Sequence, residues 1–297
     1  VPYLGSAVVA TTALLAAVGP EPAHEDDRKL LASLAEGAST AALAVPFETA
    51  PGGGLPGSVR VVGPDTGDQA GVRLAGAVSR LADALPADVL LVPADAVPHG
   101  LYLVDARADG VTRSPVVSLD GTRRLCDLTL ENVPGRRLAA GDAASAVVSA
   151  ALTAGAAMLA AEQLGLAQRC LDMTVAYAKE RRQFARQIGS FQAIKHRLAD
   201  LYVAITQARA VSRYAAACLA ESSPDTAVAV AMAKAYCGET AVKAAEECFQ
   251  LHGGIGFTWE HPAHLYLKRA KSGSIAFGSP DRHRTALAGL AGLPGPA

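Results

Sequence analysis

A long stretch without proline dominates the C-terminal half of this chain. Asp142 can cap a helix, and no proline or other clear stop follows it until about Arg182. At 1.5 Å per residue, the stretch predicts a helix on the order of 60 Å long. Such a helix has to bury its apolar side against other helices, so this half of the chain is expected to fold as a bundle.

Three further helices are expected after the first. They cover residues 190–221, 223–253 and 262–276, and the second of these begins with a capping serine followed by proline. Long antiparallel helices joined by short loops predict a four-helix bundle over residues 139–297. The 190–221 helix carries its apolar stripe on Ile194, Leu198, Leu201 and Ile205.

The N-terminal half has a different character. Residues 1–40 predict two helices, which would form the end of an N-terminal helical domain, and residues 41–138 predict a β domain. Its short β-type runs are separated by proline, glycine and aspartate, as in a small sandwich or barrel. The predicted strands are Val59–Val62, 72–78, 89–92, 101–104, 116–118 and 125–130, after a loop at 51–57. The fold class is therefore α+β.

Composition excludes several classes of protein. The 297 residues are 51% hydrophobic and 19% charged, which excludes a disordered chain. The net charge of −1 provides no basic field for nucleic acid and no polybasic patch for an anionic membrane. The apolar run 1–18 lacks a positive leading region and is interrupted by small polar residues. It is therefore expected to be a buried helix rather than a signal peptide or a membrane span.

Cysteine and histidine spacing argues against metal and disulfide chemistry. The five cysteines are widely spaced and none forms a C-x-x-C pair, which is typical of reduced thiols and of a cytoplasmic protein. His261 and His264 have an i, i+3 spacing, but no carboxylate or cysteine set accompanies them. A metal site is not expected.

Two polar segments remain as candidates for function. Arg181, in Arg181-Arg182-Gln183-Phe184, follows the longest helix, where a cation interacts well with the helix dipole. The same guanidinium is also suited to binding a phosphate.

The second segment is Gln250-Leu251-His252-Gly253-Gly254-Ile255-Gly256-Phe257. One glycine would be explained as a helix cap, but three glycines within four positions exceed that need and would let backbone approach a flat or phosphorylated ligand. The amide of Gln250 could bond a polar edge of such a ligand.

Together, and followed by Tyr266-Leu267-Lys268-Arg269-Ala270-Lys271, these segments resemble the C-terminal bundle of acyl-CoA dehydrogenases. The resemblance is carried by residues 177–184, 188–196 and 251–260, and it extends over about 141–290. It is weaker but collinear over 1–140. It implies the family fold of N-terminal helices beginning upstream of Val1, a middle β domain and a C-terminal four-helix bundle.

The resemblance also implies a flavoenzyme. Family members remove the α-proton of an acyl-CoA with a carboxylate while hydride leaves the β-carbon for FAD. The matching segments contact FAD across a subunit interface in the family. The residues implied here are Arg181, Gln183, Phe184, Gln192, Gln250, Leu251, His252, Gly253 and Gly254.

The family's catalytic base has no counterpart at the expected places. Phe277 stands where the usual glutamate is found, and the alternative position on the long helix falls near Gly155. Abstraction of a proton from carbon requires a positioned base, so no catalytic residue is assigned. Glu162, two turns beyond Gly155, is a candidate substitute, although a mid-helix glutamate is more often solvated or paired. Asp281 is expected to cap the last helix.

The β domain departs from the family pattern as well. The stretch 44–52 is collinear with a flavin-binding loop but lacks its serine and aspartate. The stretch 76–82 is collinear with a strand that stacks on the flavin but has no aromatic residue. The changes affect this subunit's own cleft, whereas the retained residues would reach a neighbour's flavin.

Three hypotheses follow. In the first, the chain resembles the non-catalytic subunit of heterotetrameric (α2β2) acyl-CoA dehydrogenases of actinobacterial steroid degradation. It would share FAD with a homologous subunit that binds most of the acyl-CoA. In the second, it is a self-sufficient homotetrameric dehydrogenase with a base such as Glu162. In the third, it is a structural paralogue without flavin. The acyl group and the electron acceptor are not identified by the sequence.

Overall fold

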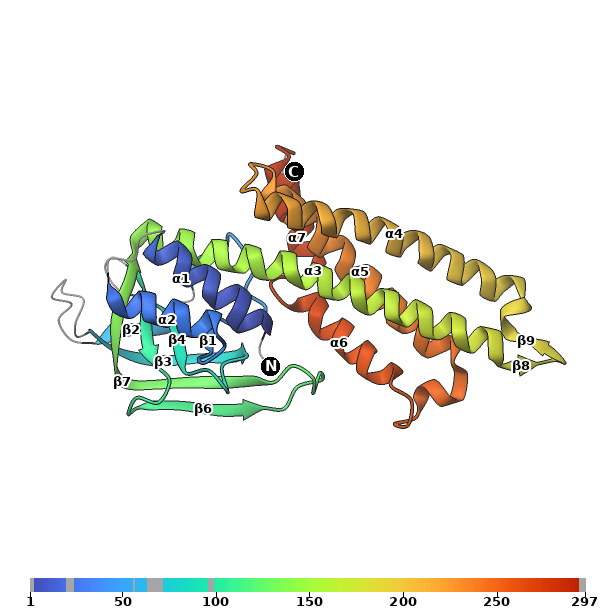
Figure 1. Ribbon diagram of the computed structural model, residues 1–297, viewed down its shortest axis with the longest axis horizontal. Coiled ribbons are helices and arrows are strands. Elements are labelled where there is room, and N and C mark those ends of the chain that lie inside the picture. The colour runs from blue at the N-terminus through green and yellow to red at the C-terminus, as the bar shows by residue number, and fades with distance from the viewer. Residues whose placement is uncertain (1–2, 20–23, 56, 63–71, 96–98, 294–297) are drawn as a thin grey trace. The chain divides into compact units, whose positions relative to one another are not determined.

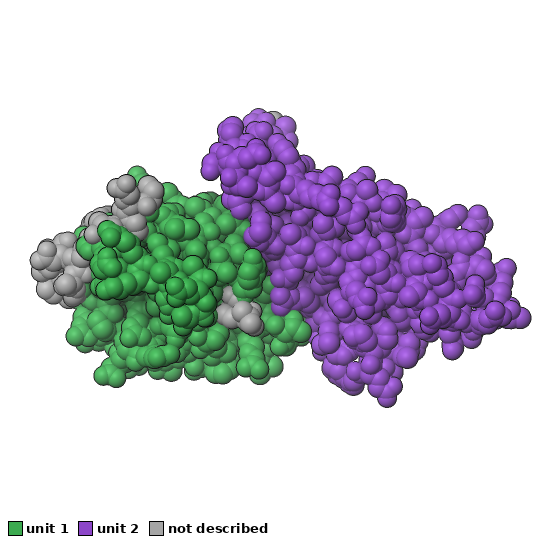
Figure 2. All heavy atoms as spheres, viewed as in Figure 1, with its two compact units in different colours: residues 1–155 green, residues 156–297 purple. Residues whose placement is uncertain are grey.

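The computed structural model describes residues 3–19, 24–55, 57–62, 72–95 and 99–293 (Figure 1). The first two residues of the 1–18 run and Pro56 of the 51–57 loop lie outside this description. The chain divides into two compact units, Val1–Gly155 and Ala156–Ala297 (Figure 2). The limit between the units falls inside the longest helix, and the predicted order of helices, strands and helices is confirmed.

Two helical segments open the first unit, as predicted. A π-helical segment, η1 (Tyr3–Ala10), continues into α1 (Thr11–Val18), and α2 (Glu25–Ala35) follows. Val9, Ala10, Ala13 and Leu14 are buried, in agreement with a buried helix. The buried carboxylate of Asp27 on α2 forms an ion pair with Arg136, which ties α2 to the sheet.

Within the described residues, seven strands form the β domain. They are β1 (Ala41–Leu43), β2 (Val59–Val62), β3 (Val72–Ala82), β4 (Val89–Ala94), β5 (Gly100–Asp105), β6 (Val111–Val116) and β7 (Leu125–Ala140). The short β1 was not predicted. The expected strand at 116–118 is wrong, because the chain pairs with β7 over β6 instead and Val117 is fully exposed. An edge strand such as β6 tolerates Pro115, which cannot donate to a ladder.

The strands of the β domain form a closed ring. Their order is β1-β4-β5-β7-β3-β2, with β6 also paired to β7, and β1 runs parallel to β4. Backbone bonds from Asp95 N to Val59 O (2.7 Å) and from Val61 N to Asp95 O (3.2 Å) join β2 back to the end of β4. Of the two predicted architectures, these bonds favour the barrel, because they close the ring β4-β5-β7-β3-β2.

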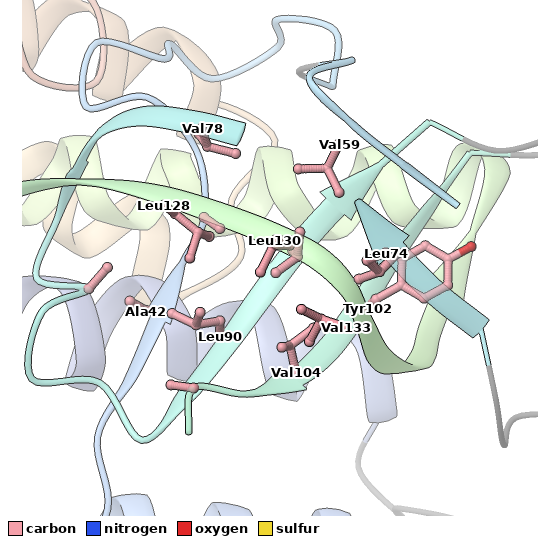
Figure 3. Packing of buried hydrophobic residues seen from close by; sticks show 14 of the residues in the cluster. Ala42, Val59, Leu74, Val78, Leu90, Tyr102, Val104, Leu128, Leu130 and Val133 are labelled. Carbon is pink, nitrogen blue, oxygen red and sulfur yellow. The ribbon is translucent and has the colours of Figure 1, made fainter. Parts of the chain in front are cut away.

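The core of this unit lies inside the ring. Leu74, Leu90, Leu128 and Leu130 are almost fully buried and belong to one apolar cluster. Figure 3 shows side chains from β1, β2, β3, β4, β5 and β7 meeting in this cluster. Alternate residues of β7 are buried near its start, as expected for a strand with one face toward the core.

Helices form the second unit. They are the later part of α3 (Gly141–Glu180), then α4 (Gln192–Ala220), α5 (Thr226–Leu251), α6 (Ala263–Ile275) and α7 (Pro280–Leu290). Side chains from α3, α4, α5 and α6 share one buried cluster, which confirms the four-helix bundle. Helix α7 adds a fifth helix that packs on α5. Many of the buried residues are alanines, whose small side chains allow helices to approach closely.

Helix starts differ from the prediction in three places. Asp142 lies in the first turn of α3, which begins at Gly141. Helix α5 begins at Thr226 rather than at Ser223-Pro224, and the Thr226 hydroxyl donates back to Ser223 O at 2.7 Å. Asp281 does not cap α7. The N-cap of α7 is Ser279, whose hydroxyl accepts from Arg282 N. Pro280 follows it at the first helical position, where its missing N–H leaves no donor to satisfy.

Helix α3 is long and apolar enough to cross a membrane by length and composition alone. In its most apolar window, 61% is buried inside the protein. A core helix of a bundle has the same character, because it faces other helices on most sides.

The barrel core predicts a stability effect. Replacing Leu128 by alanine removes a fully buried side chain and is expected to lower the free energy of unfolding by about 2–5 kcal/mol. Urea titration followed by circular dichroism measures the change. Leu119→Ala is the matched control, because Leu119 is 62% exposed and its loss should cost less than about 0.5 kcal/mol. Equal losses for the two variants would contradict this assignment of the core.

Candidate cofactor-binding site

A tight hairpin follows the end of α3. Strands β8 (Arg182–Gln183) and β9 (Arg186–Gln187) pair antiparallel, with Gln183 opposite Arg186. The two turn residues, Phe184 and Ala185, have φ values of 51° and 60°, as in the hairpin turns that match strand twist. The sequence predicted only that the long helix ends near here, because no Asn-Gly or similar pair announces the turn.

Arg181 joins α3 to this hairpin. Its N–H donates to Tyr177 O at 2.8 Å, and its carbonyl accepts from Ile188 N at 2.8 Å. Gly189 lies so close to Ala178 that an added Cβ would be 2.9 Å from the Ala178 carbonyl. The Arg181 side chain is exposed, and none of the ion pairs found within the described residues involves it. Its guanidinium donors therefore face solvent.

The remaining hairpin candidates also lie at the surface. Gln183 is exposed, with Nε2 donating to Arg182 O at 2.8 Å. Phe184 is 88% exposed, and its ring meets Phe191 edge-on with centroids 6.1 Å apart. Gln192, exposed as well, is the first residue of α4.

The second candidate segment lies at the end of α5. Gln250 is exposed in the last turn, Leu251 is half-buried, and a 3-10 segment, η3 (Gly253–Phe257), follows. Gly253 has a φ of 62°, which favours glycine. An added Cβ at Gly253 or Gly254 would meet nothing within 4 Å, so the backbone here is open on its outer side.

His252 differs from its neighbours because its side chain is buried. Nδ1 lies 2.7 Å from Cys248 O, and the ring stacks on Tyr177 with centroids 4.5 Å apart. Burial lowers the pKa of His252, but hydrogen bonds to Cys248 outweigh burial and raise it. The ring thus makes contacts inside the protein, and the expected role of His252 in cofactor binding stays a prediction. The stack holds the end of α3 against the end of α5.

The two candidate segments thus meet at one end of the second unit. Tyr177 lies one turn before Arg181, and His252 lies within the Gln250–Gly254 segment, so their stack brings both segments together. In Figure 1 the hairpin and the start of α4 lie at the same end of the bundle. Exposed guanidinium and amide donors beside open glycine backbone suit a flat, anionic ligand, so these residues fit a flavin dinucleotide.

One exposed residue of this surface was missed by sequence reasoning. The guanidinium carbon of Arg186 lies 4.0 Å from the centre of the Phe191 ring. Only the hairpin register places Arg186 beside Gln183, and no sequence signal predicted that register.

The turn between α6 and α7 holds the position of the expected base. Phe277 has a φ of 53° and is half-buried against the apolar cluster of α3, α4 and α5. The fully buried Lys234 donates from Nζ to the carbonyls of Gly273, Ser274 and Gly278 at 3.1–3.3 Å. His283 Nε2 donates to Phe277 O at 2.8 Å. The turn is therefore held from two sides, and the side chain it carries at 277 is apolar.

The two alternative positions considered for a catalytic base lie on α3. Gly155 is buried within the helix. Glu162 is half-buried, and its carboxylate accepts from Arg269 Nε at 2.7 Å. This ion pair agrees with the expectation that a mid-helix glutamate is paired with a neighbouring helix.

In the first unit, the two altered β-domain stretches lie against each other. Phe47 N donates to Arg80 O at 3.0 Å, and the Glu48 carboxylate forms an ion pair with the Arg80 guanidinium. The Phe47 side chain is buried, with the guanidinium of Arg123 over its ring. The Thr49 hydroxyl donates to Pro46 O at 2.7 Å. The polar groups of this loop are therefore used within the protein.

The α6–α7 turn predicts a pH-dependent stability. Burial, with smaller contributions from the nearby Lys234 and Arg282, lowers the pKa of His283 to about 4, although the hydrogen bond to Phe277 O opposes the shift. The unfolded chain binds more protons, so the stability from neutral His283 is complete above about pH 6.5 and declines toward about pH 4. The loss at about pH 5 is on the order of 2 kcal/mol. Urea unfolding of the protein and of His283→Gln measures it. The variant should lose less stability on acidification, and parallel pH curves would contradict this.

A scan of protein families matches the chain to the acyl-CoA dehydrogenase C-terminal domain over residues 145–290. Among curated relatives, acyl-CoA dehydrogenase IpdE2 of Mycolicibacterium smegmatis is 43% identical over 172 residues. The alignment covers 58% of this chain and 50% of IpdE2. The chain thus spans about half the length of the IpdE2 relatives that it matches.

Two solved structures match almost the whole chain. One is a chain in the structure of the ChsE4-ChsE5 complex of Mycobacterium tuberculosis, which is 31% identical to this chain with a TM-score of 0.82. The match covers 99% of this chain and 77% of that one. The other is a chain of a variant of the Tcur3481-Tcur3483 steroid acyl-CoA dehydrogenase, which is 30% identical to this chain with a TM-score of 0.82. The match covers 98% of this chain and 76% of that one. The shared fold, the matching family domain and these identities show that the chain belongs to the acyl-CoA dehydrogenase family, whose members use FAD.

Proposed function

We propose that this chain is the non-catalytic subunit of a heteromeric, FAD-dependent acyl-CoA dehydrogenase. It contributes Arg181, Gln192 and the Gln250–Gly254 segment to an FAD shared with a homologous subunit. That subunit supplies the catalytic base and binds most of the acyl-CoA. When bound, FAD accepts the hydride that leaves the substrate's β-carbon. The role of this chain is to bind and orient that cofactor.

The apolar residue in the α6–α7 turn carries the proposal. Lys234 and His283 hold the turn at the place where a catalytic carboxylate is expected, yet Phe277 directs its ring into the apolar cluster of the bundle. Proton abstraction from carbon needs a base within hydrogen-bonding reach of that proton. A phenylalanine supplies none, and the buried Gly155 supplies none from α3.

The β-domain loop supports the same division of roles. A subunit that binds flavin in its own cleft needs polar groups aimed outward from the stretch 44–52. Here Glu48 is paired with Arg80, and the Thr49 hydroxyl bonds the loop's own backbone. By contrast, Arg181, Gln192 and Gln250 are exposed at the end of the bundle. The donors that remain outward-facing are those that can serve another subunit.

Comparison with known complexes supports the proposed partner and substrate class. ChsE4 and ChsE5 form a complex with each other, and the Tcur3481-Tcur3483 enzyme is a steroid acyl-CoA dehydrogenase. By analogy we infer an α2β2 assembly with a homologous subunit and a CoA thioester of a steroid side chain as substrate. The analogy rests on shared sequence and fold rather than on substrate contacts.

The flavin content of the complex tests the proposal. Purified alone, this chain should carry no tightly bound FAD, and co-expression with the homologous subunit should yield a complex with the flavin absorbance spectrum. Arg181→Ala should weaken FAD binding by about tenfold or more, because it removes charged hydrogen bonds. Flavin fluorescence during titration of the apo complex measures the affinity.

Arg282→Ala is the matched control, since it removes an exposed arginine of α7, and α7 lies at the other end of the second unit from the hairpin (Figure 1). It should leave the affinity for FAD unchanged. Flavin bound tightly by the lone chain would contradict the proposal. If Arg181→Ala leaves the affinity of the complex for FAD unchanged, the hypothesis that this chain is a structural paralogue without flavin gains support.

Glu162 provides a separate test of the self-sufficient alternative. Removal of a true catalytic base costs about 10²–10⁴-fold in turnover. We expect Glu162→Gln to retain turnover within about twofold, because this carboxylate is already paired with Arg269. Dye reduction by the complex with a steroid side-chain acyl-CoA measures the rate, and a flavin spectrum verifies that cofactor remains bound. A loss of turnover with flavin retained would favour Glu162 as the base.

A further inference from the structure

The hairpin register places two arginines on one face. Gln183 lies directly opposite Arg186, and the bond from Ile188 N to Arg181 O places Arg181 opposite Ile188 in the same ladder. Alternate residues of a strand share a face, and directly opposed residues share it too. Arg181, Gln183 and Arg186 therefore lie on one face, and Arg182 lies on the other.

Arg186 is also held in place. Its guanidinium carbon lies 4.0 Å from the centre of the Phe191 ring, and Phe191 packs edge-on against Phe184. Phe191 directly precedes Gln192 at the start of α4. Stacking on a ring orients a guanidinium while leaving its N–H edge free to donate. Less conformational freedom is then lost when it binds a ligand.

No carboxylate neutralises these two cations within the described residues. Among the ion pairs that the structure describes, none involves Arg181 or Arg186, and both side chains are exposed. The segment 179–190 has one acidic residue, Glu180, against the cations Lys179, Arg181, Arg182 and Arg186. A pair of unneutralised guanidinium groups on one face is suited to a ligand with two neighbouring negative charges.

We propose that Arg186 acts with Arg181 as a two-arginine clamp for a pyrophosphate, that of the FAD shared with the partner subunit. The two positions are diagonal neighbours across the hairpin, about 7–8 Å apart. Long side chains from such positions converge on adjacent phosphates, and each planar fork can donate two hydrogen bonds to one phosphate. This inference rests on the proposed function, and it adds a residue that the family resemblance did not indicate.

Coenzyme A also carries a pyrophosphate, so the experiment measures the affinity for FAD and the affinity for coenzyme A separately. In the co-purified complex, Arg186→Met keeps an unbranched side chain against Phe191 but removes the charge. Arg182→Met is the matched control, because it removes the same charge from the opposite face of the same hairpin. Titration of the apo complex with FAD, followed by flavin fluorescence, measures one affinity. Calorimetric titration of the flavin-loaded complex with coenzyme A measures the other.

We expect Arg186→Met to weaken FAD binding by about 10- to 100-fold, as for lost charged hydrogen bonds. Arg182→Met should change it by less than about twofold, and coenzyme A affinity should be unchanged in both. Arg186→Lys should give an intermediate loss, because it keeps the charge without the planar fork. Removal of one phosphate contact should also lower the dependence of FAD affinity on salt, which a purely structural role would not do.

Equal FAD affinities for Arg186→Met and Arg182→Met would overturn the clamp. A fall in coenzyme A affinity with FAD affinity unchanged would overturn the assignment to FAD. Arg181→Ala separates these results from failure of the proposed function. If Arg181→Ala weakens FAD binding while Arg186→Met does not, the shared-flavin role stands and only the clamp fails. If neither substitution has an effect, the shared-flavin role fails as well.

Discussion

The stack of His252 on Tyr177 is the contact on which the candidate site depends. It joins the last turns of α3 and α5, so that two segments far apart in sequence present their polar groups at one end of the bundle. The bond between His252 Nδ1 and Cys248 O fixes the ring from the other side. His252 is buried and Tyr177 is half-buried, so water has little access to the stack, and the stack fixes the positions of the exposed residues on either side.

A second constraint explains how a turn can be retained while its chemistry is lost. Lys234 binds three carbonyls around the α6–α7 turn, and His283 binds a fourth. These bonds satisfy backbone groups that would otherwise be buried without partners, so they are needed whatever side chain the turn carries. The residue at 277 is therefore free to change without loss of the turn. In the proposed assembly, a partner subunit supplies the base and this chain supplies cofactor contacts.

Much of the fold was predictable from local patterns. Short β-type runs bounded by proline, glycine and aspartate identified five of the seven strands described in the β domain, and uninterrupted helical spans identified the bundle, because both signals come from neighbouring residues. The failures occurred where tertiary contacts decide. The strand expected at 116–118 gave way to Val111–Val116, which the pairing with β7 selects. Ser279 rather than Asp281 caps α7, because the choice depends on where the preceding turn ends.

For the site, the amino-acid sequence by itself determined which chemical groups are present: the guanidinium of Arg181, the amides of Gln192 and Gln250, and the apolar side chain at 277. These are properties of residue types in a pattern. The tertiary structure decided which of them reach the surface and which share a face. It turned His252 inward through the stack on Tyr177, a contact between residues distant in the sequence, which no local pattern contains. It also placed Arg186 opposite Gln183, because the turn at Phe184 and Ala185 sets the register of the hairpin and no turn signal in the sequence announces it.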